Sequence, residues 1–132
     1  MGCESLRGSL VFQTQVYGTS MYPTFNESGD VLLLERVSPR IGRVRSGDVV
    51  LVRSPQMPKR VVCKRVVAVE GDPVPVSFFD RTVPEGHVWV EGDNPYTSRD
   101  SRHFGPVPTQ MVQGRVFCRV SSFCFIARYR II

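Results

Sequence analysis

Apolar residues in this sequence come in short runs rich in valine, and each run ends at Gly, Pro or a polar residue after a few positions. No window of helix length repeats its apolar residues every 3.6 positions. The chain holds 11 glycines and 10 prolines, which favour many turns over long helices. The sequence therefore predicts an all-β fold with little helix. The predicted strands are residues 9–17, 31–37, 49–53, 61–69, 87–92 and 111–120.

The length of 132 residues predicts a single domain, 1–132, with one core. No apolar stretch approaches the roughly 20 residues that a membrane-spanning helix needs, so we expect the chain to carry no transmembrane anchor. The four cysteines and two histidines show neither a C-x-x-C pair nor a zinc-like spacing. We therefore expect no metal and no cofactor.

Arginine supplies almost all of the positive charge of this chain. The formal net charge is +5, and among 17 basic residues only Lys59 and Lys64 are lysines. A basic balance suits an anionic partner, such as a phospholipid surface or nucleic acid, although a generally basic surface gives the same total. A reaction that depends on lysine has only these two residues to draw on.

Lys64 stands inside the longest β-branched run, VVCKRVVAV (61–69). Alternation along a strand puts Lys64 on one face with Val62, Val66 and Ala68. An unpaired charged lysine among such neighbours is costly, and burial favours the neutral amine. A free lysine titrates near 10.4, so a shift of about three units needs roughly 4 kcal/mol from its environment. The alternative is a lysine on an edge strand whose amine reaches water.

Ser20 lies in the turn-forming segment GTSMYPTF, where a hydroxyl can stay accessible. A serine needs an adjacent base to act as a nucleophile. Neither His87, which begins a predicted strand, nor His103, which lies in a loop, has an evident carboxylate to orient it. The sequence therefore favours activation of Ser20 by Lys64, a known scheme, over a triad based on histidine. A serine that only shapes the turn is the plain alternative.

The dipeptide Gly-Asp occurs four times, at 29–30, 47–48, 71–72 and 92–93. For the first three we expect tight turns, with Gly at positive φ and Asp bonded to nearby backbone. The fourth opens a segment dense in polar residues, 92–102. Within it we expect an ion pair between Asp100 and Arg102, and one between Asp93 and Arg65 of the lysine strand. A solvated polar loop is the alternative for this segment.

Taken together, these segments resemble the type I signal peptidases, serine proteases with a Ser-Lys dyad. The match consists of four ordered boxes, which span about residues 12–120: SMYPT at 20–24, GDVV at 47–50, KRVVAVEGD at 64–72, and GDN with SRDSR at 92–102. The resemblance implies a coiled β-barrel or sandwich of short strands. It also implies Ser20 as nucleophile, Lys64 as general base and Ser98 as the residue that orients the lysine amine. Met21 and Val62, next to the dyad, are candidates for the wall of the substrate pocket.

The segment VPEGHVWVEGDN (83–94) and the short insert before it are similar to the compact members from the mitochondrial inner membrane. This likeness implies removal of presequences on the intermembrane-space side, with a second protease subunit as partner, contact with the membrane surface and no nucleic acid. We expect the chain to depart from the family in carrying no anchor before the serine box, and Gly18 stands where many bacterial members carry a serine. Alternatives are a bacterial-type signal peptidase I, a self-cleaving repressor and a non-catalytic basic β-module that binds anionic lipid or nucleic acid.

Overall fold

A computed structural model describes residues 10–25, 29–75, 81–120 and 129–131. Antiparallel strands dominate this part of the chain, and its helices are a few residues long, which confirms the predicted all-β class. The strands are β1 (Val11–Val16), β2 (Asp30–Glu35), β3 (Val49–Arg53), β4 (Val61–Val69), β5 (His87–Glu91), β6 (Val107–Pro108), β7 (Val112–Val120) and β8 (Tyr129–Ile131). The helices are α1 (Val37–Arg40), α2 (Ser101–Phe104) and the 3-10 turn η1 (Thr109–Met111).

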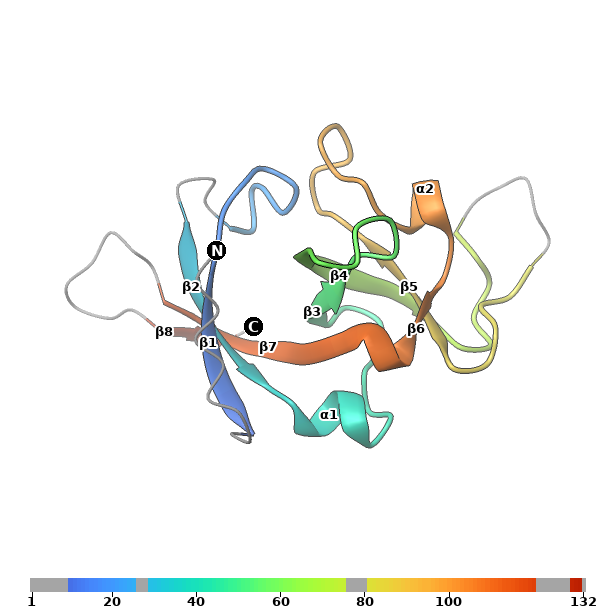
Figure 1. Ribbon diagram of the computed structural model, residues 1–132, viewed down its shortest axis with the longest axis horizontal. Helices are drawn as coiled ribbons and strands as arrows, with labels where there is room; N and C mark the ends of the chain where they lie inside the picture. The colour runs from blue at the N-terminus through green and yellow to red at the C-terminus, as the bar shows by residue number, and fades with distance from the viewer. Residues whose placement is uncertain (1–9, 26–28, 76–80, 121–128, 132) are drawn as a thin grey trace.

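The strands form one curled sheet in the order β1-β2-β7-β3-β4-β5-β6, with β8 also paired to β7 (Figure 1). β7 holds the sheet together, since it pairs with β2, β3 and β8 along its nine residues. The register shifts where β2 meets β7, where β3 meets β7 and where β4 meets β5. Such bulges increase strand twist and bending, so they account for the curl of the sheet into a half-barrel.

The core divides into two main apolar clusters that lie on either side of β3 and β4. Alternating residues of β3 go to different clusters: Val49 and Leu51 to the first, Val50 and Val52 to the second. The first cluster also holds the inward side chains of β1 and β2, and the second those of β5 and β6. β3 is therefore buried on both faces, which matches its uninterrupted run of apolar residues.

Two single helical turns were not predicted: α1, whose first residue Val37 was assigned to the strand 31–37, and α2 in the polar segment after β5. In α1 the carboxylate of Glu35 accepts hydrogen bonds from the backbone N–H groups of Val37 and Ser38, at 2.7 and 2.9 Å. In α2 the carboxylate of Asp100 caps the helix and accepts the N–H of Arg102. A segment of four residues is too short to show a helical period in the sequence. The side-chain caps that stabilise these turns are therefore the only local signal for them.

The first three Gly-Asp turns have the expected glycine conformation, and two of them also have the expected hydrogen bond from backbone to Asp. Gly29, Gly47 and Gly71 all lie at positive φ, a region that only glycine enters without strain. The carboxylate of Asp48 accepts the N–H of Arg45, and that of Asp72 accepts the N–H of Val69. These turns set the ends of β2, β3 and β4. A search of the described residues for a helix long and apolar enough to cross a membrane finds none.

Candidate active site

Lys64 lies in the middle of β4, opposite Val50 of β3, with only 3% of its surface exposed. Its neighbour Cys63, on the other face of the strand, is also buried. Burial is the largest influence on the amine and lowers the pKa of Lys64. The carboxylate of Asp100 opposes this shift, and the charge of Arg102 adds to it. The lysine is therefore not an edge residue that reaches into water, and its environment favours the neutral base.

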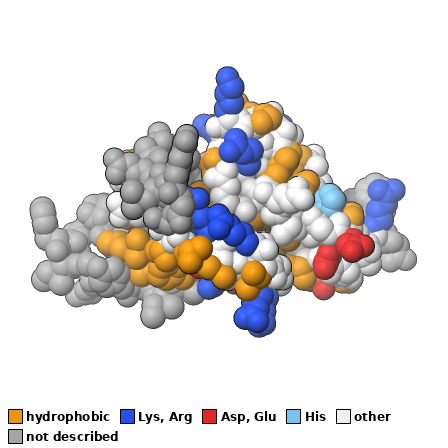
Figure 2. Space-filling model, turned by 60° about the horizontal axis from the view of Figure 1, so that its bottom comes forward, with side chains coloured by type: hydrophobic (Ala, Val, Ile, Leu, Met, Phe, Trp, Pro, Cys, Tyr) orange, Lys and Arg blue, Asp and Glu red, His pale blue; other side chains and the backbone are white. Residues whose placement is uncertain are grey.

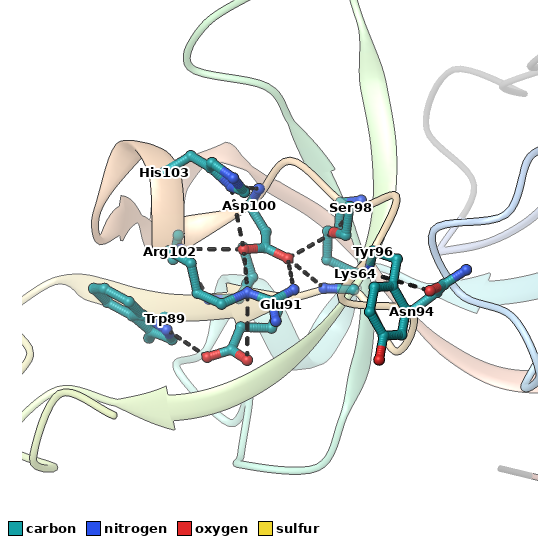
Figure 3. Close-up of polar contacts among 12 residues, drawn as sticks. Lys64, Trp89, Glu91, Asn94, Tyr96, Ser98, Asp100, Arg102 and His103 are labelled. Carbon is teal, nitrogen blue, oxygen red and sulfur yellow. Dashed lines mark hydrogen bonds and ion pairs between the residues drawn. The ribbon is translucent and has the colours of Figure 1, made fainter. Parts of the chain in front are cut away.

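The amine of Lys64 is held by a short chain of hydrogen bonds from the segment that follows β5 (Figure 3). Its Nζ donates to Ser98 Oγ at 3.1 Å, and the hydroxyl of Ser98 donates to Asp100 Oδ2 at 2.6 Å. Because Ser98 gives its proton to the carboxylate, its oxygen presents lone pairs to the amine. Ser98 therefore fixes the direction of the lysine side chain.

Asp100 is completely buried and accepts hydrogen bonds from several donors besides Ser98. Arg102 donates from Nε at 2.9 Å and from Nη2 at 2.6 Å, and the N–H of Gly92 donates at 2.8 Å. Burial by itself disfavours the carboxylate, but these hydrogen bonds outweigh it and lower the pKa of Asp100 to about 2. The group therefore stays ionised at physiological pH and serves as a fixed anchor, not as a proton carrier.

A second ion pair ties the lysine strand to the same segment. Arg65 binds Asp93 through Nε and Nη2, both at 2.9 Å, and donates from Nη1 to the carbonyl of Gly47. The hydroxyl of Thr24, in the turn that contains Ser20, donates to Asp93 as well. Burial opposes ionisation of Asp93, but the bonds from Arg65 and Thr24 prevail and lower its pKa. The predicted pair is present, and it also reaches the serine turn.

Ser20 lies in the turn between β1 and β2, and this turn is bound to the segment that follows β5. The N–H of Asn94 donates to the carbonyl of Ser20 at 2.8 Å, and Thr19 donates to Thr97 at 3.0 Å. A Cβ on Gly92 would lie 2.6 Å from the Ser20 carbonyl and 2.2 Å from Ser98 Oγ. The serine turn and Ser98 therefore pack against the same face of Gly92, and Ser98 in turn contacts Lys64.

The two candidates for the pocket wall lie in separate places. Met21 is buried in the first apolar cluster together with Cys63, whereas Val62 packs against the second cluster. The structure therefore does not bring Met21 and Val62 together. Val62 and Cys63 point to opposite faces of β4, so Cys63 is the strand residue that shares the surroundings of Met21.

Three residues that matter for this geometry were not singled out from the sequence as site residues. Gly92 permits the close approach of two loops, Thr24 links the serine turn to Asp93, and Cys63 packs with Met21. Gly92 belongs to the fourth Gly-Asp pair, which opens the polar segment 92–102. That position in the sequence could have indicated a role for Gly92 in the site. The described residues hold no group of three or more His, Cys, Asp or Glu side chains placed to bind a metal ion.

Comparison with known proteins assigns the family. The model of the family described as "Signal peptidase, peptidase S26" matches residues 4–78 and 75–121. The chain belongs to the peptidase S26 family. It is thus a serine-type peptidase, and a Ser-Lys dyad is typical of this family. A signal peptidase I of Enterococcus faecalis superimposes with a TM-score of 0.45 and 22% identity, over 55% of this chain and 95% of that chain.

Within peptidase S26, the relatives are proteases of the mitochondrial inner membrane. The chain is 49% identical over 119 residues to the mitochondrial ATP-independent inner membrane protease subunit 1a of Arabidopsis thaliana, covering 84% of this chain and 71% of that protein. It is 42% identical over 118 residues to subunit 1 of the human protease, covering 83% and 70%. Subunit 2 of Danio rerio is 42% identical over 113 residues, covering 80% and 62%. The relatives are thus named as two kinds of subunit, and they associate this S26 peptidase with the mitochondrial inner membrane.

Proposed function

We propose that this chain is an endopeptidase that removes sorting presequences from proteins inserted in or crossing the mitochondrial inner membrane, at its intermembrane-space side, with Ser20 and Lys64 as catalytic dyad. The observation that carries the proposal is the buried amine of Lys64, held by Ser98 beside the turn that bears Ser20. The names of the relatives support protease activity at the mitochondrial inner membrane.

The chemistry follows from the environment of the amine. Neutral Lys64 takes the proton of Ser20 Oγ, which attacks the scissile carbonyl and forms a tetrahedral oxyanion. The backbone N–H of Ser20 donates to that oxyanion. Protonated Lys64 then gives its proton to the leaving amine, and an acyl-enzyme ester remains on Ser20. A water, deprotonated by Lys64, hydrolyses the ester and restores both groups.

Ser98 and Asp100 act in this scheme as positioning residues. They hold the Lys64 amine in one orientation during the reaction, so less conformational entropy is lost on reaching the transition state. The permanent charge of Asp100 also favours the protonated lysine that forms during the attack. A second protease subunit and the membrane surface complete the set of proposed partners, alongside the presequence-bearing substrate.

The test is peptide cleavage by single variants that remove each reactive group. Ser20→Ala and Lys64→Ala should each abolish turnover of a presequence peptide, while circular dichroism shows the sheet retained. Lys59→Ala is the matched control, because Lys59 is the other lysine and is exposed on the loop between β3 and β4. We expect it to keep full activity.

Two results would contradict the proposal. Cleavage that survives in either Ser20→Ala or Lys64→Ala would exclude the dyad. A chain that binds anionic lipid or nucleic acid, cleaves nothing and binds equally well in both variants would be a basic binding module instead. Mass spectrometry after reaction with a serine-directed electrophile adds an independent measurement, since the label should sit on Ser20.

A further inference from the structure

A basic cleft lies at the end of the sheet where α1 is found, away from the serine turn. Its volume is about 740 Å³, and three arginines line it: Arg36, Arg40 and Arg53. Gln110 and Gln113 also line the cleft, and their side-chain amides are neutral hydrogen-bond donors. Among the residues that the structure describes, no Asp or Glu lines this cleft. Its chemistry is that of a site for an anion with several acceptor oxygens.

Two of the guanidinium groups are already held in place. Arg36 stacks on the ring of Phe12, with its guanidinium carbon 4.2 Å from the ring centre. Its Nε is buried and has no hydrogen-bond partner within the described part of the chain. Arg53 donates from Nη1 to the carbonyl of Pro58 at 2.6 Å and keeps its other donors. Guanidinium groups that are held in place before binding lose less conformational entropy when they bind an anion.

Exposed aliphatic side chains lie on the segments that border the cleft, and we call these side chains its rim. Eight large hydrophobic side chains of the described residues are exposed, and five of them belong to segments that border the cleft. These five are 40–57% exposed: Leu10, Val11, Val37, Ile41 and Met57. Figure 2 turns this end of the molecule forward and shows hydrophobic side chains in a band beside Lys and Arg. Aliphatic side chains around a cationic centre suit the interface of an anionic bilayer.

We propose that this cleft binds the phosphate of an anionic phospholipid while its rim enters the headgroup layer. The inference rests on the proposed function at a membrane and names the surface that makes the contact. A lipid fits better than an acidic protein segment, because the exposed side chains of the rim are aliphatic. The phosphate accepts hydrogen bonds from the arginines, and the attraction of the bilayer for Arg40 and Arg53 adds to it.

The position of the cleft leaves the proposed dyad accessible. Ser20 follows the opposite end of β1 from Phe12, and in Figure 1 its loop lies at the far side from α1. Lys64 lies three residues along β4 from Val61, which lines the cleft, and this corresponds to about 10 Å of strand. Docking at this end therefore holds the peptidase near the bilayer without covering its catalytic residues.

The experiment is sedimentation of the full chain with vesicles. Wild type should bind an equimolar mixture of phosphatidylcholine and phosphatidylglycerol, should bind phosphatidylcholine alone far less, and should be released by salt. Arg40→Gln/Arg53→Gln, two exposed positions, should weaken binding to the mixed vesicles by at least about tenfold. Arg81→Gln/Arg99→Gln removes the same charge outside the cleft and should change binding much less. Ile41→Ser should also weaken binding, since it removes part of the rim.

Three outcomes would overturn the inference. In the first, wild type shows no preference for the anionic vesicles. In the second, the two arginine double variants lose binding equally. In the third, the chain binds soluble polyglutamate through Arg40 and Arg53 but does not bind vesicles. The last would identify an acidic protein as occupant. Cleavage of a soluble peptide without vesicles should be unchanged in Arg40→Gln/Arg53→Gln. A loss of lipid binding would therefore contradict only the lipid site, not the proposed protease activity. An absence of cleavage by the wild type would contradict the protease activity, whatever the vesicle result.

Discussion

At the scale of single residues, the site depends on the balance of influences on one amine. Burial of Lys64 favours the neutral amine. The carboxylate of Asp100, which is hydrogen-bonded to Ser98, favours the protonated amine. Burial is the larger of the two, so the pKa of Lys64 is lowered. The carboxylate of Asp100 therefore favours the protonated amine that the proposed mechanism forms, while burial still keeps the pKa of Lys64 below its ordinary value.

The pH dependence of cleavage tests this balance. We expect kcat/KM to fall as pH falls through the lowered pKa of Lys64, because protonation removes the base. Ser98→Ala should lower kcat/KM by on the order of 10²-fold, as for a misplaced catalytic group. It should also move the midpoint of the pH profile, because the amine loses its hydrogen-bond partner. An unchanged midpoint would assign Ser98 a structural role only.

Asp100 makes a separate contribution to stability in acid. Its pKa of about 2 lies below the ordinary value of 3.8, so the folded state binds this proton less readily than the unfolded chain. The resulting stability, about 2 kcal/mol, is present above pH 4 and disappears as pH falls towards 2. In Asp100→Asn this part of the pH dependence should be absent. Urea unfolding between about pH 5 and pH 2 measures it, and identical slopes in both proteins would contradict it.

At the scale of elements, local patterns predicted six of the eight strands in the described part of the chain. They missed the short strands β6 and β8 and the order in which the strands pair. The ranges 49–53 and 61–69 agree with β3 and β4 residue for residue, since both segments are rich in valine and bounded by turn-forming residues. The insertion of β7 between β2 and β3 could not be predicted, because it joins residues far apart in sequence. The ion pairs of Arg65 and Arg102 were expected, whereas the bond from Thr24 and the apolar-rimmed cleft arise only when distant segments meet.

Gly92, directly after β5, allows a test of the contact between the serine turn and the segment that carries Ser98. Gly92→Ala should push Ser98 and the Ser20 carbonyl apart, because both occupy the space of the new Cβ. We expect loss of most peptide cleavage, with the thermal unfolding midpoint lowered by only a few degrees. Asn94→Ala is the neighbouring control, since its backbone N–H still reaches Ser20. Full activity in Gly92→Ala would show that the two loops need not touch.

At the scale of the whole molecule, β7 connects the serine side of the sheet to the lysine side. β1 and β2 carry the turn with Ser20, β3 and β4 carry Lys64, and β7 lies between β2 and β3. The placement of Ser20 relative to Lys64 therefore depends on a strand that contributes neither residue. Its buried Val116 packs in the first apolar cluster.

Val116→Ala should destabilise the whole fold by roughly 2 kcal/mol, from the lost methyl groups and the cavity that remains. Gln113→Ala, at a partly exposed position on the same strand, should stay within about 0.5 kcal/mol of wild type. Urea titrations followed by fluorescence of Trp89 report both values. Equal effects of the two substitutions would argue against β7 as the centre of the sheet.

The contacts across Gly92 set an order of events during synthesis. The serine turn is made early, but the carboxylate that anchors the lysine and the strand that joins both halves come near the end of the chain. If Ser20 and Lys64 act as proposed, a nascent chain that carries only the serine turn still lacks the groups that position the amine. We therefore expect cleavage to begin only after the later segments have folded onto that turn.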